Sequence, residues 1–179
     1  MSIVGLYFGS EPIGTPDAPP APFVPATAVV ALVGVVRLLL VNNTDVKFWC
    51  DQRVFHHTAD QGTVKPHIVI TRESAERPRT MDGTVNYVRG RIQVDVYAPE
   101  LRQWLPLVKA IANALENHGN DVEAVAAARQ QGMQISYLEL DDEQDISTQP
   151  FEGQQGPAMR GTAMFFSYMI TKPATAGGA

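Results

Sequence analysis

The stretch TMDGTVNYVRGRIQVDVYAPELRQWLPLVKAIANALEN, residues 80–117, decides the fold of this chain. It opens on Asp82-Gly83, a turn signal, because Asp hydrogen-bonds its own backbone and Gly accepts positive φ. The residues that follow, to position 97, alternate in polarity. One parity is apolar or small: Val88, Gly90, Ile92, Val94 and Val96. The other is mostly polar: Arg89, Arg91, Gln93, Asp95 and Tyr97. A period of two with one apolar face predicts a half-buried strand.

The period of the apolar residues changes after Pro99. They now recur at spacings of three and four: Leu101, Trp104, Leu105, Val108, Ile111, Ala112 and Leu115. This spacing predicts an amphipathic helix. We expect that helix to fold back onto the apolar face of the preceding strand, which leaves the polar row from Arg89 to Asp95 on the other face.

Further elements are predicted on both sides of this unit. Residues 28–41 form a Val- and Leu-rich run that indicates a buried helix, and residues 121–131 indicate a short Ala-rich helix. Four more strands are predicted at residues 53–55, 66–73, 135–142 and 159–171. The length of 179 residues favours one domain with a substantial core.

The first 25 residues are predicted to form an arm outside that domain. Its first eight residues are largely apolar and end on Tyr7 and Phe8, and the rest is rich in proline and therefore extended. An apolar tip on such a tether folds back on its own domain or lies on a neighbour, with a disordered tail as the alternative. Tyr7 and Phe8 are therefore candidates for a subunit or partner interface. The domain itself is predicted to span residues 26–172, and a flexible small-residue tail residues 173–179.

Composition excludes several classes of function. The net charge of −5 lacks the surplus of Lys and Arg that a duplex-DNA binder needs to displace counterions. The N-terminus has no positively charged region typical of a signal peptide. The most apolar run, residues 26–41, is shorter than the roughly 20 residues that span a bilayer, so no membrane partner is expected.

No metal or cofactor site is predicted. The single cysteine, Cys50, excludes an internal disulfide and a Cys-based zinc site, and we interpret it as a buried apolar residue. His56 and His57 are adjacent, and neighbours on a strand point to opposite faces, so they are not expected to share one ion. The acidic run at residues 141–145 lacks the spacing of a calcium loop and is interpreted as a solvated strand end.

Catalysis is not predicted either. The Gly-containing turns lack a phosphate-binding fingerprint at a strand-to-helix junction. No nucleophile elbow of the Gly-x-Ser-x-Gly type is present. We therefore expect a protein that is not an enzyme and has no catalytic residues.

Two polar features remain to be explained. The first is the connection at residues 73–82, which carries Arg77 and Arg79 and is longer than a tight hairpin needs. The second is the strand row that contains Arg89, Arg91 and Asp95. That row either faces solvent or forms a protein interface or channel lining, and its mixed sign suits pairing between subunits better than a grip on DNA. All five residues are interface candidates.

The order of these elements resembles a known family. The relevant segments are PHIVITR at 66–72, MDG at 81–83, RIQVDVYA at 91–98, AIANAL at 110–115 and RGTAMFFSY at 160–168. Together they resemble the tail-completion or tail-terminator family of long-tailed bacteriophages, over about residues 28–172. The Pro-rich arm and an insertion at residues 120–133 depart from the family pattern.

The resemblance implies a fold and a role. The fold is α+β, with a mostly antiparallel sheet of four to five strands and two main helices packed on one face. Copies of such proteins assemble into a ring, typically a hexamer, which caps the tail tube and meets the head-side connector or head-closure protein. The expected place is the neck of the virion at the top of the tail, after assembly in the bacterial cytoplasm. Genome DNA would pass through the lumen without specific binding, and the net acidic charge agrees with this.

Two alternatives stay open at this point. One is another neck component, namely a head-closure or adaptor protein of similar size. The other is a small cytoplasmic domain that binds anions through Arg72, Arg77 and Arg79.

Overall fold

The computed structural model describes residues 25–59, 63, 65–76, 87–146 and 159–172. Within these residues the chain forms a five-stranded sheet in the order β1-β2-β3-β5-β4. The strands are β1 (Val54–His56), β2 (His67–Glu76), β3 (Tyr87–Ala98), β4 (Gln134–Asp145) and β5 (Arg160–Thr171). The helices are α1 (Pro25–Asn42), α2 (Thr44–Cys50), α3 (Leu101–Glu116) and α4 (Val122–Gln130), with a 3-10 turn η1 (His118–Asn120).

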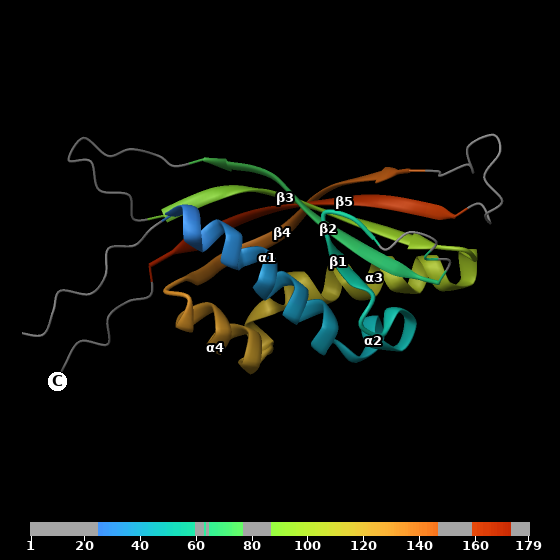
Figure 1. Cartoon of the computed structure of the whole chain (residues 1–179), viewed down its shortest axis with the longest axis horizontal. Helices are drawn as coiled ribbons and strands as arrows, with labels where there is room; N and C mark the ends of the chain where they lie inside the picture. Colours follow the sequence, from blue (N-terminus) through green and yellow to red (C-terminus); the bar gives the residue numbers. More distant parts are fainter. Residues whose placement is uncertain (1–24, 60–62, 64, 77–86, 147–158, 173–179) are drawn as a thin grey trace, which may run out of the picture.

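The helices cover one face of this sheet (Figure 1), and the strands are antiparallel except for the parallel pair β1–β2. The two long helices, α1 and α3, supply most of the helical layer. The predicted α+β class is therefore confirmed. None of the described helices is long and apolar enough to span a membrane.

The core lies between β3 and the two long helices. Ile92, Val94 and Val96 of β3 are fully buried, as the alternation of the sequence predicts. Leu107, Ile111 and Leu115 of α3 are fully buried as well, and they recur at helical spacing. A third set comes from α1, whose apolar residues dominate its sequence: Leu32, Val36 and Leu40. Burial of this apolar surface supplies the main driving force for the fold.

Strand β2 continues further than the sequence suggested. Residues 73–76 were expected in a connecting loop, but they pair with β3, with Ser74 opposite Arg91 and Glu76 opposite Arg89. A β-bulge between Arg72 and Ser74 inserts Glu73 and keeps the two strands in register beyond that point. The remainder of the predicted loop lies outside the described residues.

A close approach between three strands fixes this end of the sheet. The Tyr168 hydroxyl of β5 reaches across Gly90 of β3 and donates a hydrogen bond of 3.1 Å to the Ser74 carbonyl of β2. A Cβ at position 90 would lie 2.7 Å from the Tyr168 hydroxyl oxygen and would also meet the Ser74 carbonyl. Gly90 is thus required by space, because any side chain there would displace the tyrosine or the bulged strand.

The short strand β1 is held by two arginines. Arg37 of α1 donates from Nε to the Val54 carbonyl at 3.1 Å. Arg53 donates to the Pro66 carbonyl at 2.9 Å and to the Trp49 carbonyl at 3.1 Å. These bonds satisfy backbone acceptors at the edge of the sheet, where a three-residue strand has few ladder bonds of its own.

Candidate interaction surface

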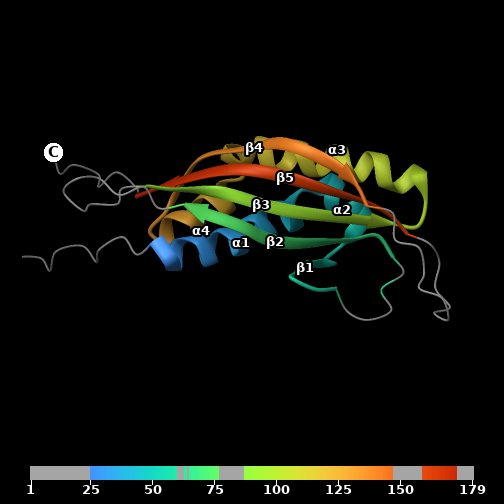
Figure 2. The same cartoon turned by 90° about the horizontal axis from the view of Figure 1, so that it is seen from above.

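The sheet has one face that the helices do not cover, and we call it the open face (Figure 2). The burial pattern of β3 places its polar row there, since the alternate residues Ile92, Val94 and Val96 are buried under the helices. The strand register shows which side chains share it. Arg91 lies opposite Ser167 of β5, and Asp95 lies opposite Val69 of β2 and Ala163 of β5. Directly opposed residues in a sheet point to the same side, so the open face extends from β2 to β4.

Arg91 occupies the centre of this face. Its Nε lies 3.6 Å from a Glu73 carboxylate oxygen and 3.7 Å from an Asp141 carboxylate oxygen. Its guanidinium carbon stands 4.5 Å above the ring centre of Phe165, which is only 8% exposed. The Ser167 hydroxyl donates to the same Asp141 carboxylate. One arginine thus connects β3 to β2, β5 and β4 by ion pairing and a cation–π contact.

Arg89, two residues earlier, has a different environment. It forms one ion pair of 3.0 Å with Glu76, and both side chains are more than half exposed. Exposed pairs of this kind contribute little to stability. Arg89 and Arg91 therefore lie on the same face of β3 but differ in the number of contacts that fix their side chains.

The other end of the row is more enclosed. Gln93 donates a hydrogen bond of 2.7 Å to Asp95. Burial raises the pKa of Asp95 above its usual value, and the hydrogen bond from Gln93 partly opposes that rise. The ring of Tyr97 stacks on His67 with 5.0 Å between ring centres. Burial and the nearby charge of Asp95 raise the pKa of Tyr97.

His67 is 6% exposed at the corner of the open face. Burial lowers the pKa of its imidazole, the hydrogen bond to the Lys65 carbonyl at 3.0 Å opposes this, and the charge of Arg53 lowers the pKa further. The rings of Phe55 and His67 are arranged edge to face, with 6.1 Å between their centres. His67 thus lies among aromatic rings in a setting that disfavours its charged form.

The predicted interface residues divide into two groups. Tyr7, Phe8, Arg77 and Arg79 lie outside the described residues. The other three lie on the open face, in the settings given above: Arg89, Arg91 and Asp95. Sequence reasoning missed Glu73, Asp141 and Phe165, the partners of Arg91. They are far from it in sequence or displaced by bulges, so no local period indicated them.

The two adjacent histidines are arranged differently from the prediction. His57 has a φ of 68°, in the left-handed region, which turns the chain out of β1 directly after His56. Their rings consequently do not point to opposite faces but lie together, with 4.0 Å between centres and a tilt of 32°. The expected absence of a shared metal site stays a prediction. No group of three or more potential ligands gathers among the described residues.

Cys50 has the environment of a core residue. It is fully buried at the end of α2, and burial raises the pKa of its thiol to about 12 although the charge of Arg53 acts against this. A thiol that stays protonated is a poor nucleophile.

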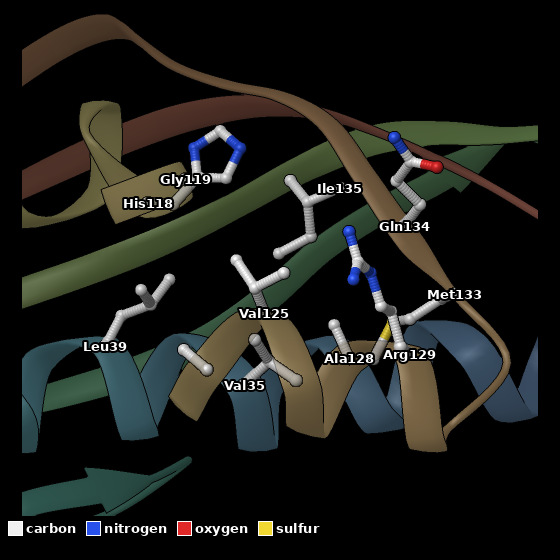
Figure 3. A pocket seen from close by; sticks show the side chains of 11 residues that line it. Val35, Leu39, His118, Gly119, Val125, Ala128, Arg129, Met133, Gln134 and Ile135 are labelled. Atoms are coloured by element: carbon white, nitrogen blue, oxygen red, sulfur yellow. The ribbon is translucent and has the colours of Figure 1, made fainter. Parts of the chain in front are cut away.

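A small crevice lies between α1, α4, η1 and the start of β4 (Figure 3). Its volume is about 230 Å³. Val35, Val125 and Ile135 supply apolar walls, and His118 and Arg129 supply polar atoms at its border. Ligand and cofactor sites are commonly larger, at about 300–1,000 Å³. The open face is therefore the better candidate for a functional surface.

A comparison with known families assigns the chain. Residues 34–153 match the model of tail completion protein gp17, which is about two thirds of the 179 residues. The chain belongs to the tail completion protein gp17 family. It is a structural protein of a phage tail, and the predicted resemblance to the tail-completion family is confirmed.

Two further comparisons concern curated proteins and solved structures. No curated protein matches the chain significantly. A chain in the virion of a native gene transfer agent particle shares the fold, with a TM-score of 0.59 and 11% identity. The match covers 80% of this tail completion family member and 97% of the other chain. At that identity the likeness concerns the fold alone.

Proposed function

We propose that this protein forms a homo-oligomeric ring, a hexamer, that caps the phage tail tube and joins it to the head-side connector or head-closure protein. Membership of the tail completion family supports this role. The observation that carries it is the open face, a broad polar surface of mixed charge centred on Arg91. Such a surface suits contact with identical copies, because each sign of charge can find its opposite on a neighbour.

The open face is proposed to meet a neighbouring subunit or the lumen of the ring. Acidic side chains outnumber basic ones there. Besides Glu73, Glu76, Asp95 and Asp141, the register places Glu139 and Asp142 on the same side as Arg89 and Arg91. A lumen with an acidic excess lets DNA pass, because it offers few cations to replace the counterions of phosphates.

Segments outside the described residues are proposed to make the outward contacts. The arm at residues 1–25, with Tyr7 and Phe8 near its tip, reaches a neighbour or the tube. Arg77 and Arg79, in the connection between β2 and β3, are proposed as partner contacts. Residues 26–172 are proposed to act as one domain.

The proposed location is the neck of the virion, at the top of the tail, after assembly in the cytoplasm of the bacterial host. The role is structural and requires no catalysis or cofactor. Passage of DNA and contact with the tube depend on shape and charge alone.

Light scattering of the purified full chain and labelling of intact virions test the proposal together. We expect the mass of a closed ring in solution and label at the head–tail junction, on the tail side. A strict monomer at high concentration, with no label on virions, contradicts the proposal. Label on the head side of the junction instead favours a head-closure or adaptor role.

A further inference from the structure

An open groove crosses the outer surface of the helical layer, on the side away from the open face. One wall is the C-terminal end of α1 and the start of α2. The other is the end of α3, η1 and the start of α4. Its volume is about 1,220 Å³, several times that of the crevice under α4. We call it the amide groove, because side-chain amides dominate its lining: Asn42, Asn43, Gln52, Asn113, Asn117 and Asn120.

Several of these amides are free to bind a ligand. Among the described residues, the side chains of Gln52, Asn113 and Asn120 make no hydrogen bond with protein atoms. Asn43 uses its carbonyl oxygen to cap α2, at 3.0 Å from the Asp45 amide, and keeps its NH2 group available. The groove therefore presents neutral donors and acceptors beside three charged side chains, Lys47, Asp121 and Glu123; the amide of Asn42 already donates to the two carboxylates.

Apolar side chains also contribute to the lining of the amide groove. Val122 lines it from the first turn of α4 and is 81% exposed, the highest value among the large hydrophobic side chains of the described residues. Leu39, Val41 and Ala114 belong to the same lining. Such exposure marks a contact site when polar groups lie beside it.

Free amide donors beside apolar side chains match an extended proline-rich chain. Such a chain has carbonyl groups without internal hydrogen bonds and few N–H groups, so it requires donors from its partner. The free Asn and Gln side chains of the groove supply such donors. The exposed side chain of Val122 offers apolar surface to the proline rings.

We propose that the amide groove binds residues 12–24 of a neighbouring copy of this chain. This stretch carries five prolines, at positions 12, 16, 19, 20 and 22, and Pro25 follows it directly. Its remaining residues are mainly small or apolar, so it has the chemistry that the groove accepts. The inference rests on the proposed ring, because it requires copies arranged side by side.

The length of α1 favours an arm from a neighbouring copy, rather than the chain's own arm, as the segment bound in the groove. The arm joins α1 at Pro25, whereas the groove lies at Asn42, the other end of this 18-residue helix. The helix is about 27 Å long, so a self-bound arm would have to reverse at once and run back along it. Proline restricts its own backbone and that of the residue before it, so a reversal within a sequence that contains Pro19, Pro20 and Pro22 is unfavourable. At about 3.1 Å per residue, 24 residues in polyproline II conformation would span about 70 Å, enough to meet the next copy.

Cysteine cross-linking between two differently tagged full-length chains tests the inference. One chain carries Ala21→Cys in the arm and the other Asn117→Cys in the groove. The native Cys50 stays in place, since it is buried. We expect a disulfide-linked heterodimer in several-fold higher yield than with Glu139→Cys, an exposed position on the open face. Equal yields for the two positions overturn the inference.

A chain with both cysteines distinguishes self-binding from exchange. At low concentration, exclusive formation of an intrachain disulfide overturns the assignment to a neighbour, whereas covalent multimers support it. The mass of the unmodified chain is measured in parallel. A ring without the arm-to-groove link overturns this inference alone, while a monomer under all conditions overturns the proposed ring as well.

A charged substitution in the lining of the groove gives a second measurement. Val122→Asp is expected to shift the light-scattering mass toward smaller species and to leave the circular dichroism spectrum unchanged. Leu105→Asp is the matched control, because Leu105 is 61% exposed and does not line the groove. An equal shift for both variants, or a ring unaffected by Val122→Asp, contradicts the inference.

Discussion

The two faces of the sheet are made by the same strands and differ completely in how their side chains are held. On the covered face, Ile92, Val94 and Val96 are sealed against helices and have no polar neighbour to satisfy. On the open face, Arg89, Arg91 and Asp95 depend on ion pairs, ring contacts and hydrogen bonds of unequal strength. The covered face sets the stability of the fold, and the open face remains available for contacts with other molecules.

The largest effect is expected from a charge on the covered face. Val94→Asp should prevent folding, because a buried carboxylate without a partner costs several kcal/mol against a total stability of about 5–15 kcal/mol. Circular dichroism and gel filtration measure the outcome. Leu105→Asp introduces the same charge at an exposed site and should fold normally. A Val94→Asp chain that melts like the parent would show that the covered face is not the core.

The next effect concerns the crossing of Tyr168 over Gly90. Gly90→Ala should lower the free energy of unfolding by about 1–3 kcal/mol, the usual cost of overpacking. Urea titration provides the measurement. Gly34→Ala is the control, since a Cβ there meets nothing within 4 Å, and it should be neutral or stabilise α1 by about 0.5–1 kcal/mol. Equal stabilities of the two variants would contradict the crowding at Gly90.

A smaller difference should separate the two arginines of the open face. Arg91→Ala loses two ion pairs and uncovers Phe165, and we expect a loss of about 1 kcal/mol. Arg89→Ala removes an exposed pair and should change the unfolding free energy by less than about 0.5 kcal/mol. Paired urea titrations compare them. If Arg89→Ala lowers the unfolding free energy more than Arg91→Ala does, the contacts of Arg91 do not stabilise the open face as proposed.

The smallest effect is expected from pH. The pKa of His67 lies below its ordinary value of 6.5, so the unfolded chain binds this proton more readily than the folded chain. The stability that His67 provides is complete above 6.5 and is lost as the pH falls through that value. Melting temperatures from about pH 8 to about pH 5 should fall less steeply for His67→Gln than for the parent.

His56→Gln is the control for this pH series. Burial also lowers the pKa of His56, but its side chain is exposed, so its share of the slope should be smaller. A larger change of slope with His56→Gln than with His67→Gln would show that the enclosed corner of the open face is wrongly assigned.

The sequence predicted the covered face well because its information is local. The alternation around Ile92 and the three-and-four spacing around Ile111 identify buried faces directly, since each period belongs to one kind of backbone. The parity of β3 likewise placed Arg89, Arg91 and Asp95 together on the opposite side. The sequence thus predicted that these three residues lie on one face of the sheet. It did not predict that their side chains are buried to different extents.

The features that the sequence did not predict depend on strand register, on single backbone angles and on the packing of helices. Glu73 and Asp141 meet Arg91 because bulges displace β2 and β4 by one residue, and a bulge has no strong local signal. His57 adopts a positive φ, which is uncommon for a residue other than glycine, so the contact between the two histidine rings could not be foreseen. The amide groove combines residues from five helical segments, α1, α2, α3, η1 and α4, and exists only after they pack.

The position of β5 has a consequence for the synthesis of the protein. β5 follows the other strands in the chain, yet it lies between β3 and β4, and among the described strands β4 pairs with β5 alone. A nascent chain that stops before residue 160 can form the β2–β3 ribbon but has no sheet position for β4. The sheet is therefore completed only when the last strand leaves the ribosome, and prematurely terminated copies present an open β3 edge instead of a finished subunit.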